Sequence, residues 1–225
     1  GGTPAPPGAI LDGKPVETIN ANLTASADTV AARRISTNAG ISFQGPVKVG
    51  AFDVEDNVAL EWLSSPNPHG RPNSDVLTPW LNGKDITTRP RNCWIINYGE
   101  TNQAEAALYD LPFRYVEAVI KPNRLGNADR QRRENWWRLG RSGADWMVAA
   151  DGLSRTLFTP RVAKHRLFAW AIGTTLPDSA VVAFARSDDL FFGVLHSRFH
   201  EVWALRMGTR LETRPRYTPS TCFDT

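Results

Sequence analysis

The spacing of apolar residues along the chain changes near residue 189. Residues 180–185 (AVVAFA) form a short, almost wholly apolar run, which is typical of a β-strand covered on both faces. Beyond it the apolar residues recur every three or four positions, as on one side of an α-helix: Phe191, Val194, Leu195, Phe199, Val202 and Trp203. Gly208 is a usual helix stop. The pattern predicts a strand followed by a long helix, 190–207, as the centre of the core.

Elsewhere the same patterns predict a mixture of short helices and strands. Helices are expected at 24–34, 53–63, 101–120 (interrupted at Pro112), 128–139 and 145–152. Strands are expected at 41–49 and 93–98, and as a hairpin formed by 156–162 and 166–172. We therefore expect an α+β domain in which a curved, mixed β-sheet packs against several helices, chiefly those at 190–207 and 101–120.

The N-terminal stretch differs from the rest in composition. It begins with a run rich in Gly, Pro and Ala that shows no period, so residues 1–28 are expected to be an arm or linker. Residues 29–225 then form one domain, which is long enough to bury a sizeable core.

Composition narrows the class of protein. The chain has 41% hydrophobic and 22% charged residues, which is ordinary for a soluble globular protein. The two cysteines, Cys93 and Cys222, do not make a disulfide framework, so a reducing cytoplasm is expected. The sequence shows no signal peptide and no apolar run long enough to cross a bilayer, and no membrane partner is expected.

Charge is distributed unevenly along the chain. Residues 114–166 contain twelve Lys and Arg against five Asp and Glu, a local charge of +7. Because the whole chain carries +3, the remainder carries −4. Such asymmetry indicates a face that binds a polyanion on an otherwise nearly neutral protein.

Two stretches within this basic segment are candidates for nucleic-acid contacts. In the predicted helix 128–139 (ADRQRRENWWRL), one face carries Arg130, Arg133 and Trp137, and the adjacent face carries Arg132 and Trp136. Bases and sugars can stack on tryptophan while guanidinium groups contact phosphates. The alternative is that a tryptophan belongs to the core and the arginines form a solvated face.

The second candidate is the turn 160–165 of the predicted hairpin. Arg161 and Lys164 are able to donate hydrogen bonds to guanine N7 and O6, and His165 is able to donate or accept. A hairpin tip of this kind suits a major groove. The alternative is a positively charged hairpin without a specific role.

One motif resembles a metal site but lacks its catalytic residue. His196 and His200 are four residues apart on the predicted helix, as are the zinc ligands of a metalloprotease helix. Such a helix needs a glutamate directly after the first histidine, where it acts on the metal-bound water. Ser197 occupies that position, so we predict no metal site.

The stretch PWLNGKDI (79–86) resembles the P-x-L-x-G-K-D-I signature of target recognition domains in amino-adenine DNA methyltransferases of the TaqI-like and type IIL kinds. Further stretches resemble one family in the same order: SFQG (42–45), GRPNSDV (70–76), WII (94–96), TPRVAKHR (159–166), FFGVLH (191–196) and YTPSTCF (217–223). Over about residues 30–225 the chain is similar to the MmeI-like restriction–modification enzymes and their YeeA-type methyltransferase relatives.

This resemblance implies a target recognition domain that binds duplex DNA sequence-specifically. The parent enzyme would use it to position an adenine-N6 methyltransferase, with or without a fused nuclease. The glycine-rich loop for S-adenosylmethionine and the Asn-Pro-Pro-Tyr/Phe motif of such enzymes do not occur here, and Pro66–His69 is not a match. No nuclease motif of the D-x-n-E-x-K kind is evident. We therefore expect no catalytic residues and no cofactor in this chain, and two partners: duplex DNA and the parent's methyltransferase domain.

Three other classes remain as alternatives. The first is an enzyme that uses His196 and His200, or Cys93. The second is an RNA-binding module in which Trp136 and Trp137 stack single-stranded bases. The third is a protein-interaction module without a nucleic-acid role. Under the favoured hypothesis the candidate DNA contacts are Lys84, Arg130, Arg132, Arg133, Trp136, Arg161, Lys164 and His165.

Overall fold

A four-stranded antiparallel sheet crosses the middle of the protein, seen here in a computed structural model that describes residues 8–17, 19, 25, 29 and 32–225. Its strand order is β3-β10-β7-β8, with bounds Ser42–Gln44, Val181–Phe184, Arg155–Pro160 and Ala169–Ile172. All four residues of β10 are 0% exposed, which confirms the strand predicted at 180–185.

A second four-stranded sheet, β4-β6-β5-β9, lies beside the first; its bounds are Asp53–Val54, Cys93–Ile96, Leu77–Leu81 and Leu176–Pro177. β5 and β9 are parallel and the other pairs antiparallel, so this sheet is mixed. The chain passes between sheets after Pro177: Asp178 N–H donates to Leu81 O in one, and Val181 O accepts from Gly45 N in the other. The α+β class is therefore as predicted, but the expected single sheet is divided in two.

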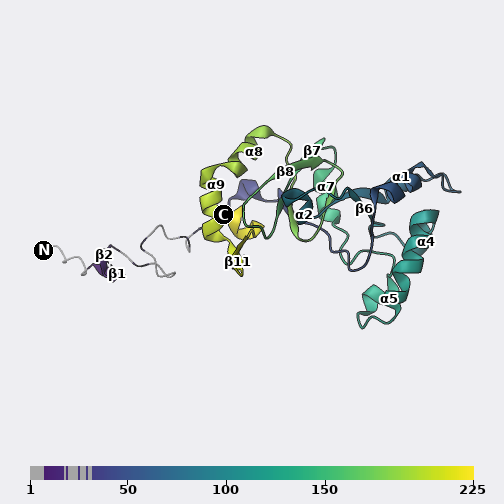
Figure 1. The fold of residues 1–225 in the computed structure, drawn as a ribbon, viewed down its shortest axis with the longest axis horizontal. Coiled ribbons are helices and arrows are strands. Elements are labelled where there is room, and N and C mark those ends of the chain that lie inside the picture. Colours follow the sequence, from purple (N-terminus) through teal and green to yellow (C-terminus); the bar gives the residue numbers. More distant parts are fainter. Residues whose placement is uncertain (1–7, 18, 20–24, 26–28, 30–31) are drawn as a thin grey trace.

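Ten α-helices are present among the described residues: α1 Asp56–Ser64, α2 Gly83–Thr87, α3 Gln103–Ala106, α4 Asp110–Val119, α5 Lys121–Leu125, α6 Arg130–Glu134, α7 Ala144–Ala150, α8 Asp189–His196, α9 Arg198–Met207 and α10 Pro219–Cys222. Two 3-10 helices, η1 Ser36–Asn38 and η2 Asn73–Asp75, are also present in the same part of the chain. α3 begins with the capping box formed by Asn102 and Glu105. Figure 1 shows α4 and α5 at one end of the sheets and α8 and α9 at the other. No helix of the described part is long and apolar enough to cross a membrane.

Two short hairpins complete the described structure. β1 (Ala9–Leu11) pairs with β2 (Lys14–Val16) inside the predicted arm, and β11 (Thr209–Leu211) pairs with β12 (Arg214–Arg216) near the C-terminal end. The helix predicted at 24–34 lies largely outside the described residues.

The long helix predicted at 190–207 is wrong in two respects. It is broken at Ser197, which is extended (φ −65°, ψ 151°) and whose hydroxyl accepts a hydrogen bond from His200 N at 3.2 Å, so the serine caps a second helix. Only Leu195 and Ala204 are buried in these helices, whereas Phe199 is 90% exposed. α8 and α9 therefore cover one side of the core and are not its centre.

The core lies on both faces of the first sheet. Because strand side chains alternate, Val181 and Ala183 enter a large cluster shared with the second sheet and α1, α4 and α7. Val182 and Phe184 enter a smaller cluster under α8, α9 and the C-terminal segment, which also contains Tyr217. The smaller cluster contains Phe168, which directly follows the loop after β7, so this cluster supports that loop from the interior.

Candidate nucleic-acid interface

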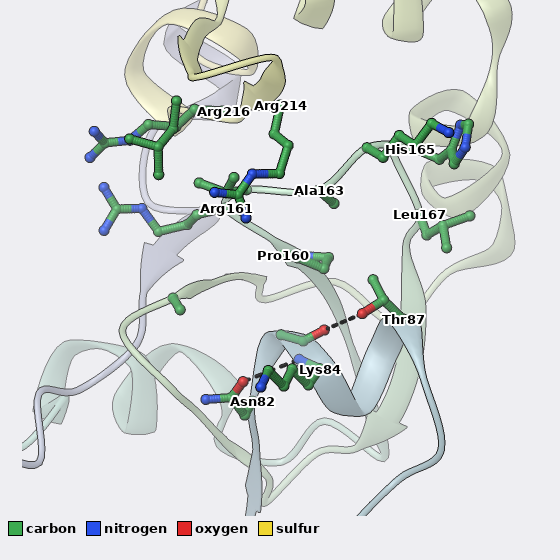
Figure 2. Close-up of a pocket in the computed structure, with 15 residues that line it drawn as sticks. Asn82, Lys84, Thr87, Pro160, Arg161, Ala163, His165, Leu167, Arg214 and Arg216 are labelled. Atoms are coloured by element: carbon green, nitrogen blue, oxygen red, sulfur yellow. Dashed lines mark hydrogen bonds between the residues drawn. The ribbon is translucent and has the colours of Figure 1, made fainter.

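A basic groove of about 610 Å³ lies between three segments that are distant in sequence. They are the start of α2, the loop 161–167 that follows β7, and the β11–β12 hairpin (Figure 2). Its charged and titratable lining residues are Lys84, Arg161, Lys164, His165, Arg214 and Arg216. The structure thus brings together four of the eight predicted contacts, including Lys84, which is far from the others in sequence.

The start of helix α2 is fixed by a capping box. Asn82 accepts from Lys84 N at 3.1 Å, and Asp85 accepts in return from Asn82 N at 2.7 Å. Gly83 packs against Pro160, since a Cβ built on it would be in ordinary van der Waals contact, 3.4 Å from the Pro160 Cβ. α2 therefore begins directly beside the end of β7.

Asp85 is the nearest acid in sequence to Lys84, but it is bound elsewhere. The Arg91 guanidinium donates to both of its carboxylate oxygens, at 3.0 and 3.1 Å. Burial tends to raise the pKa of Asp85, but the hydrogen bonds from Arg91 and the Asn82 backbone outweigh it and the pKa is lowered. The Lys84 ammonium is left without a hydrogen bond or ion pair in the described structure.

The loop after β7 is joined to β12 by backbone hydrogen bonds. Tyr217 N donates to Arg161 O at 2.7 Å, Ala163 N donates to Pro215 O at 3.3 Å, and Val162 bridges Arg216. This pairing brings Arg214 and Arg216 to the groove. Sequence reasoning missed both, although the C-terminal stretch alternates arginine with turn residues.

The groove carries positive charge that no acid compensates fully. None of its lining residues is Asp or Glu. Among residues 8–17, 19, 25, 29 and 32–225, only Arg214 of this lining has an ion-pair partner, Glu212 at 2.9 Å. Arg161 donates only to a neutral carbonyl, Ser179 O, at 3.2 Å. Burial first, then the charges of Arg216 and Arg141, lower the pKa of Arg161. Figure 2 shows Arg161 and Arg216 on one side of the groove and His165 on the other. An anion bound here would relieve this repulsion.

The arginines of α6 lie in a different environment. Arg130 forms an ion pair with Glu134 at 2.7 Å, Arg132 with Asp129 at 3.1 Å, and Arg133 donates to a backbone carbonyl. Each of the three predicted contacts thus has a partner within six residues.

Trp136 is a correction to the predicted contacts. The helix predicted at 128–139 ends at Glu134, and Trp136 folds back into the core, where it is 4% exposed. Its ring packs against Phe113, and the Lys121 ammonium lies 4.7 Å from the ring centroid. A tryptophan gains more from burying its large apolar surface than from exposure, so in this conformation Trp136 has no free face for a base.

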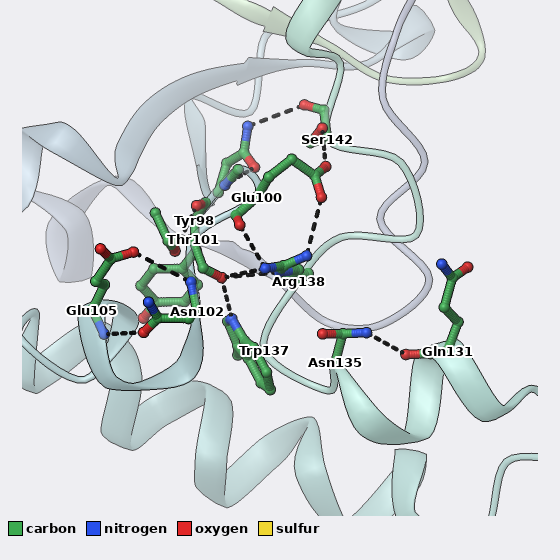
Figure 3. A network of polar contacts seen from close by, with 12 residues as sticks. Tyr98, Glu100, Thr101, Asn102, Glu105, Gln131, Asn135, Trp137, Arg138 and Ser142 are labelled. Atoms are coloured by element: carbon green, nitrogen blue, oxygen red, sulfur yellow. Dashed lines mark hydrogen bonds and ion pairs between the residues drawn. The ribbon is translucent and has the colours of Figure 1, made fainter.

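A polar network joins the same region to the loop before α3 (Figure 3). Trp137 Nε1 donates to Thr101 O at 3.0 Å, and Arg138 donates to Thr101 O and forms an ion pair with Glu100 at 3.1 Å. The adjacent cavity, of about 470 Å³, is lined by arginines and also by Glu100 and Asp129. Its charge is therefore mixed, unlike that of the groove.

The residues of the enzyme hypothesis have structural partners. His196 Nε2 accepts from Phe168 N at 3.3 Å, and His200 Nε2 lies 3.0 Å from the Tyr217 hydroxyl. Burial, then the Arg166 charge, lowers the pKa of His200 to about 4. Burial also raises the pKa of the Cys93 thiol, which reduces its thiolate fraction. Within the described residues no three His, Cys, Asp or Glu side chains gather as metal ligands would.

Comparisons with known proteins bear on the fold. No family model matches the chain, and no curated protein matches it. Among solved structures, the chain is similar to the type IIL restriction–modification enzyme MmeI, determined in complex with DNA: the TM-score is 0.67 and the sequence identity 17%. The match covers 94% of this chain and 28% of that enzyme, so this chain spans about a quarter of its length.

Proposed function

We propose that this chain is a target recognition domain that binds duplex DNA through the basic groove. The observation that carries the proposal is the convergence of cations from three segments on a surface whose lining contains no acid. The similarity of the fold to part of a DNA-bound restriction–modification enzyme supports the same class.

The groove offers both kinds of contact that DNA recognition needs. Arg161 and Arg216 lie together without an acid, which suits a backbone phosphate or another electron-rich acceptor. Lys164, His165 and Arg214 are exposed and able to donate to base edges. Phosphate contacts supply most of the affinity and a few side chains supply the sequence preference.

In this proposal the chemistry belongs to another part of the enzyme. S-adenosylmethionine and the adenine-N6 methyl transfer are assigned to a methyltransferase domain that this domain positions over its target. The absence of the cofactor loop and catalytic motif from the sequence supports that division. Duplex DNA is favoured over single-stranded RNA because the two tryptophans expected to stack bases, Trp136 and Trp137, are both buried.

The test is the salt dependence of binding. The purified chain is expected to bind random-sequence duplex DNA with an affinity that falls linearly, on logarithmic axes, as salt rises. Arg161→Ala is expected to reduce that slope by about one unit. A single-stranded RNA of equal length should compete poorly. Salt-independent binding, or preferential displacement by the RNA, would contradict the proposal.

A further inference from the structure

The second half of the loop that follows β7, residues 164–167, has no backbone–backbone hydrogen bonds to other described residues. The first half is paired with β12 through Arg161, Val162 and Ala163. Within the described part of the chain, the backbone of Lys164, His165 and Arg166 forms no hydrogen bond. Yet this half carries Lys164 and His165, two of the groove's exposed polar side chains. Something else must hold it in place.

The Arg166 side chain provides that hold from the inner side of the loop. Its Nη1 donates to the Thr159 hydroxyl at 3.0 Å and to Pro160 O, both at the end of β7. The Thr159 hydroxyl in turn donates to Leu167 O at 2.7 Å, which closes the neck of the loop. These contacts tie the loop, directly after Lys164 and His165, back to the end of β7.

The same guanidinium also meets the hairpin side of the groove. It lies over the ring of Tyr217, 4.9 Å from the centroid, and Tyr217 directly follows β12. Tyr217 is only 1% exposed and is held from behind by His200, so its ring is a fixed surface. A cavity of about 60 Å³ remains between the loop after β7, the β11–β12 hairpin and α9. Close packing of side chains therefore does not fill the space between the loop and the hairpin.

The chemistry of Arg166 separates it from the other cations of this region. Burial, as the largest cause, lowers its pKa, and within the described residues no carboxylate lies within ion-pair distance. A partly buried arginine with only neutral partners is costly to the fold unless its hydrogen bonds and ring contact are well made. Arg166 is absent from the lining of the groove, so DNA bound there would not touch it.

We infer that Arg166 is a positioning residue, which orients Lys164 and His165 toward the bound DNA by joining the loop to β7 and to Tyr217. This inference rests on the proposed function. In this inference Arg166 raises the affinity for DNA by holding Lys164 in place, and not through a contact of its own with the DNA.

The experiment is a pair of double-mutant cycles. A preferred duplex is first selected from a random pool with the wild-type protein, and affinities for it are measured by fluorescence anisotropy at one salt concentration. Arg166→Met keeps the length of the side chain and removes its donors; it is expected to weaken binding about tenfold, the loss of about one good contact. Lys164→Ala alone should cost about fivefold.

The decisive comparison is between the two doubles. In the Arg166→Met background, Lys164→Ala should cost less than about twofold, because the lysine is already misplaced. Lys84→Ala, on the opposite wall, should cost the same factor in both backgrounds. If Arg166→Met only lowered the stability of the protein, Lys164→Ala and Lys84→Ala would each reduce the affinity by the same factor in both backgrounds. Lys164→Ala costing its full factor in the Arg166→Met background would overturn the inference.

Further variants separate the remaining explanations. Arg166→Lys keeps the charge but loses the flat face that lies over the Tyr217 ring, so it should also reduce the effect of Lys164→Ala. Full wild-type behaviour would mean that only charge matters and would overturn the inference. If Arg166→Met melts below the assay temperature, Thr159→Val replaces it, with the same criterion. Wild-type protein that shows no salt-dependent duplex binding would overturn the proposed function itself, and this inference with it.

Discussion

Two regions of this protein are rich in arginine and lysine, and only one of them has charge to offer a ligand. Around α6, Arg130 and Arg132 are neutralised by Glu134 and Asp129 within the same few residues. In the groove, Lys84, Arg161 and Arg216 come from different segments and form no ion pair with any acid that the structure describes. A count of charges along the sequence does not separate the two cases.

The difference arises from where the nearest acids lie. At α6 they lie three and four residues away on the same helical turn, where ion pairs form readily. At the groove the nearby Asp85 is held by Arg91, and Glu212 pairs with Arg214. Uncompensated charge therefore distinguishes these two basic regions, whereas total charge does not.

The largest expected effect concerns Trp136, which follows α6, and tests whether this residue belongs to the core. Trp136→Ala should lower the free energy of unfolding by about 3–5 kcal/mol, because it opens a cavity among buried aromatic rings. Phe199→Ala, at the exposed face of α9, is the control and should change it by less than about 0.5 kcal/mol. Urea denaturation of both variants is the measurement. A Trp136→Ala protein as stable as the wild type would contradict the assignment of this tryptophan to the core.

The next effect compares the two basic regions directly. Arg161→Glu with Arg216→Glu should weaken duplex binding by about 100-fold, because two contacts are lost and repulsion of phosphates is added. Arg130→Glu with Arg132→Glu changes the net charge equally and should cost less than about threefold. Anisotropy titrations of both proteins at one salt concentration give the comparison. Equal losses would show that long-range charge, and not the groove, dominates binding.

The smallest effect concerns the cluster that supports the groove. Folding lowers the pKa of His200 from about 6.5 to about 4, so the folded state favours the neutral ring. This contribution to stability is complete above pH 6.5 and is lost as pH falls from 6.5 toward 4, because the unfolded chain then binds the proton more readily. The urea midpoint should therefore decrease between pH 7 and pH 5, and less so in His200→Gln. Identical pH dependence in the two proteins would exclude His200 as its origin.

Local patterns predicted much of the secondary structure. The apolar run at 180–185, the strand at 93–98 and the capping box at Asn102 and Glu105 are all present, because each depends on neighbours within a few residues. The helix at 190–207 was predicted too long, because the spacing of apolar residues does not show that Ser197 ends one helix and caps the next. The helix at 128–139 failed for a related reason: its tryptophans gain more by entering the core than by extending the helix.

The sequence by itself determined that this protein has an α+β core, an uneven distribution of basic residues, and a loop with Arg161, Lys164 and His165 at the end of a buried strand. Only the tertiary structure decided which cations act together. Lys84 and Arg216 join that loop through the packing of α2 on Pro160 and the backbone pairing of β12. Such contacts between distant segments leave no periodic signal in the sequence, because they depend on how whole elements pack and not on the residues next to them.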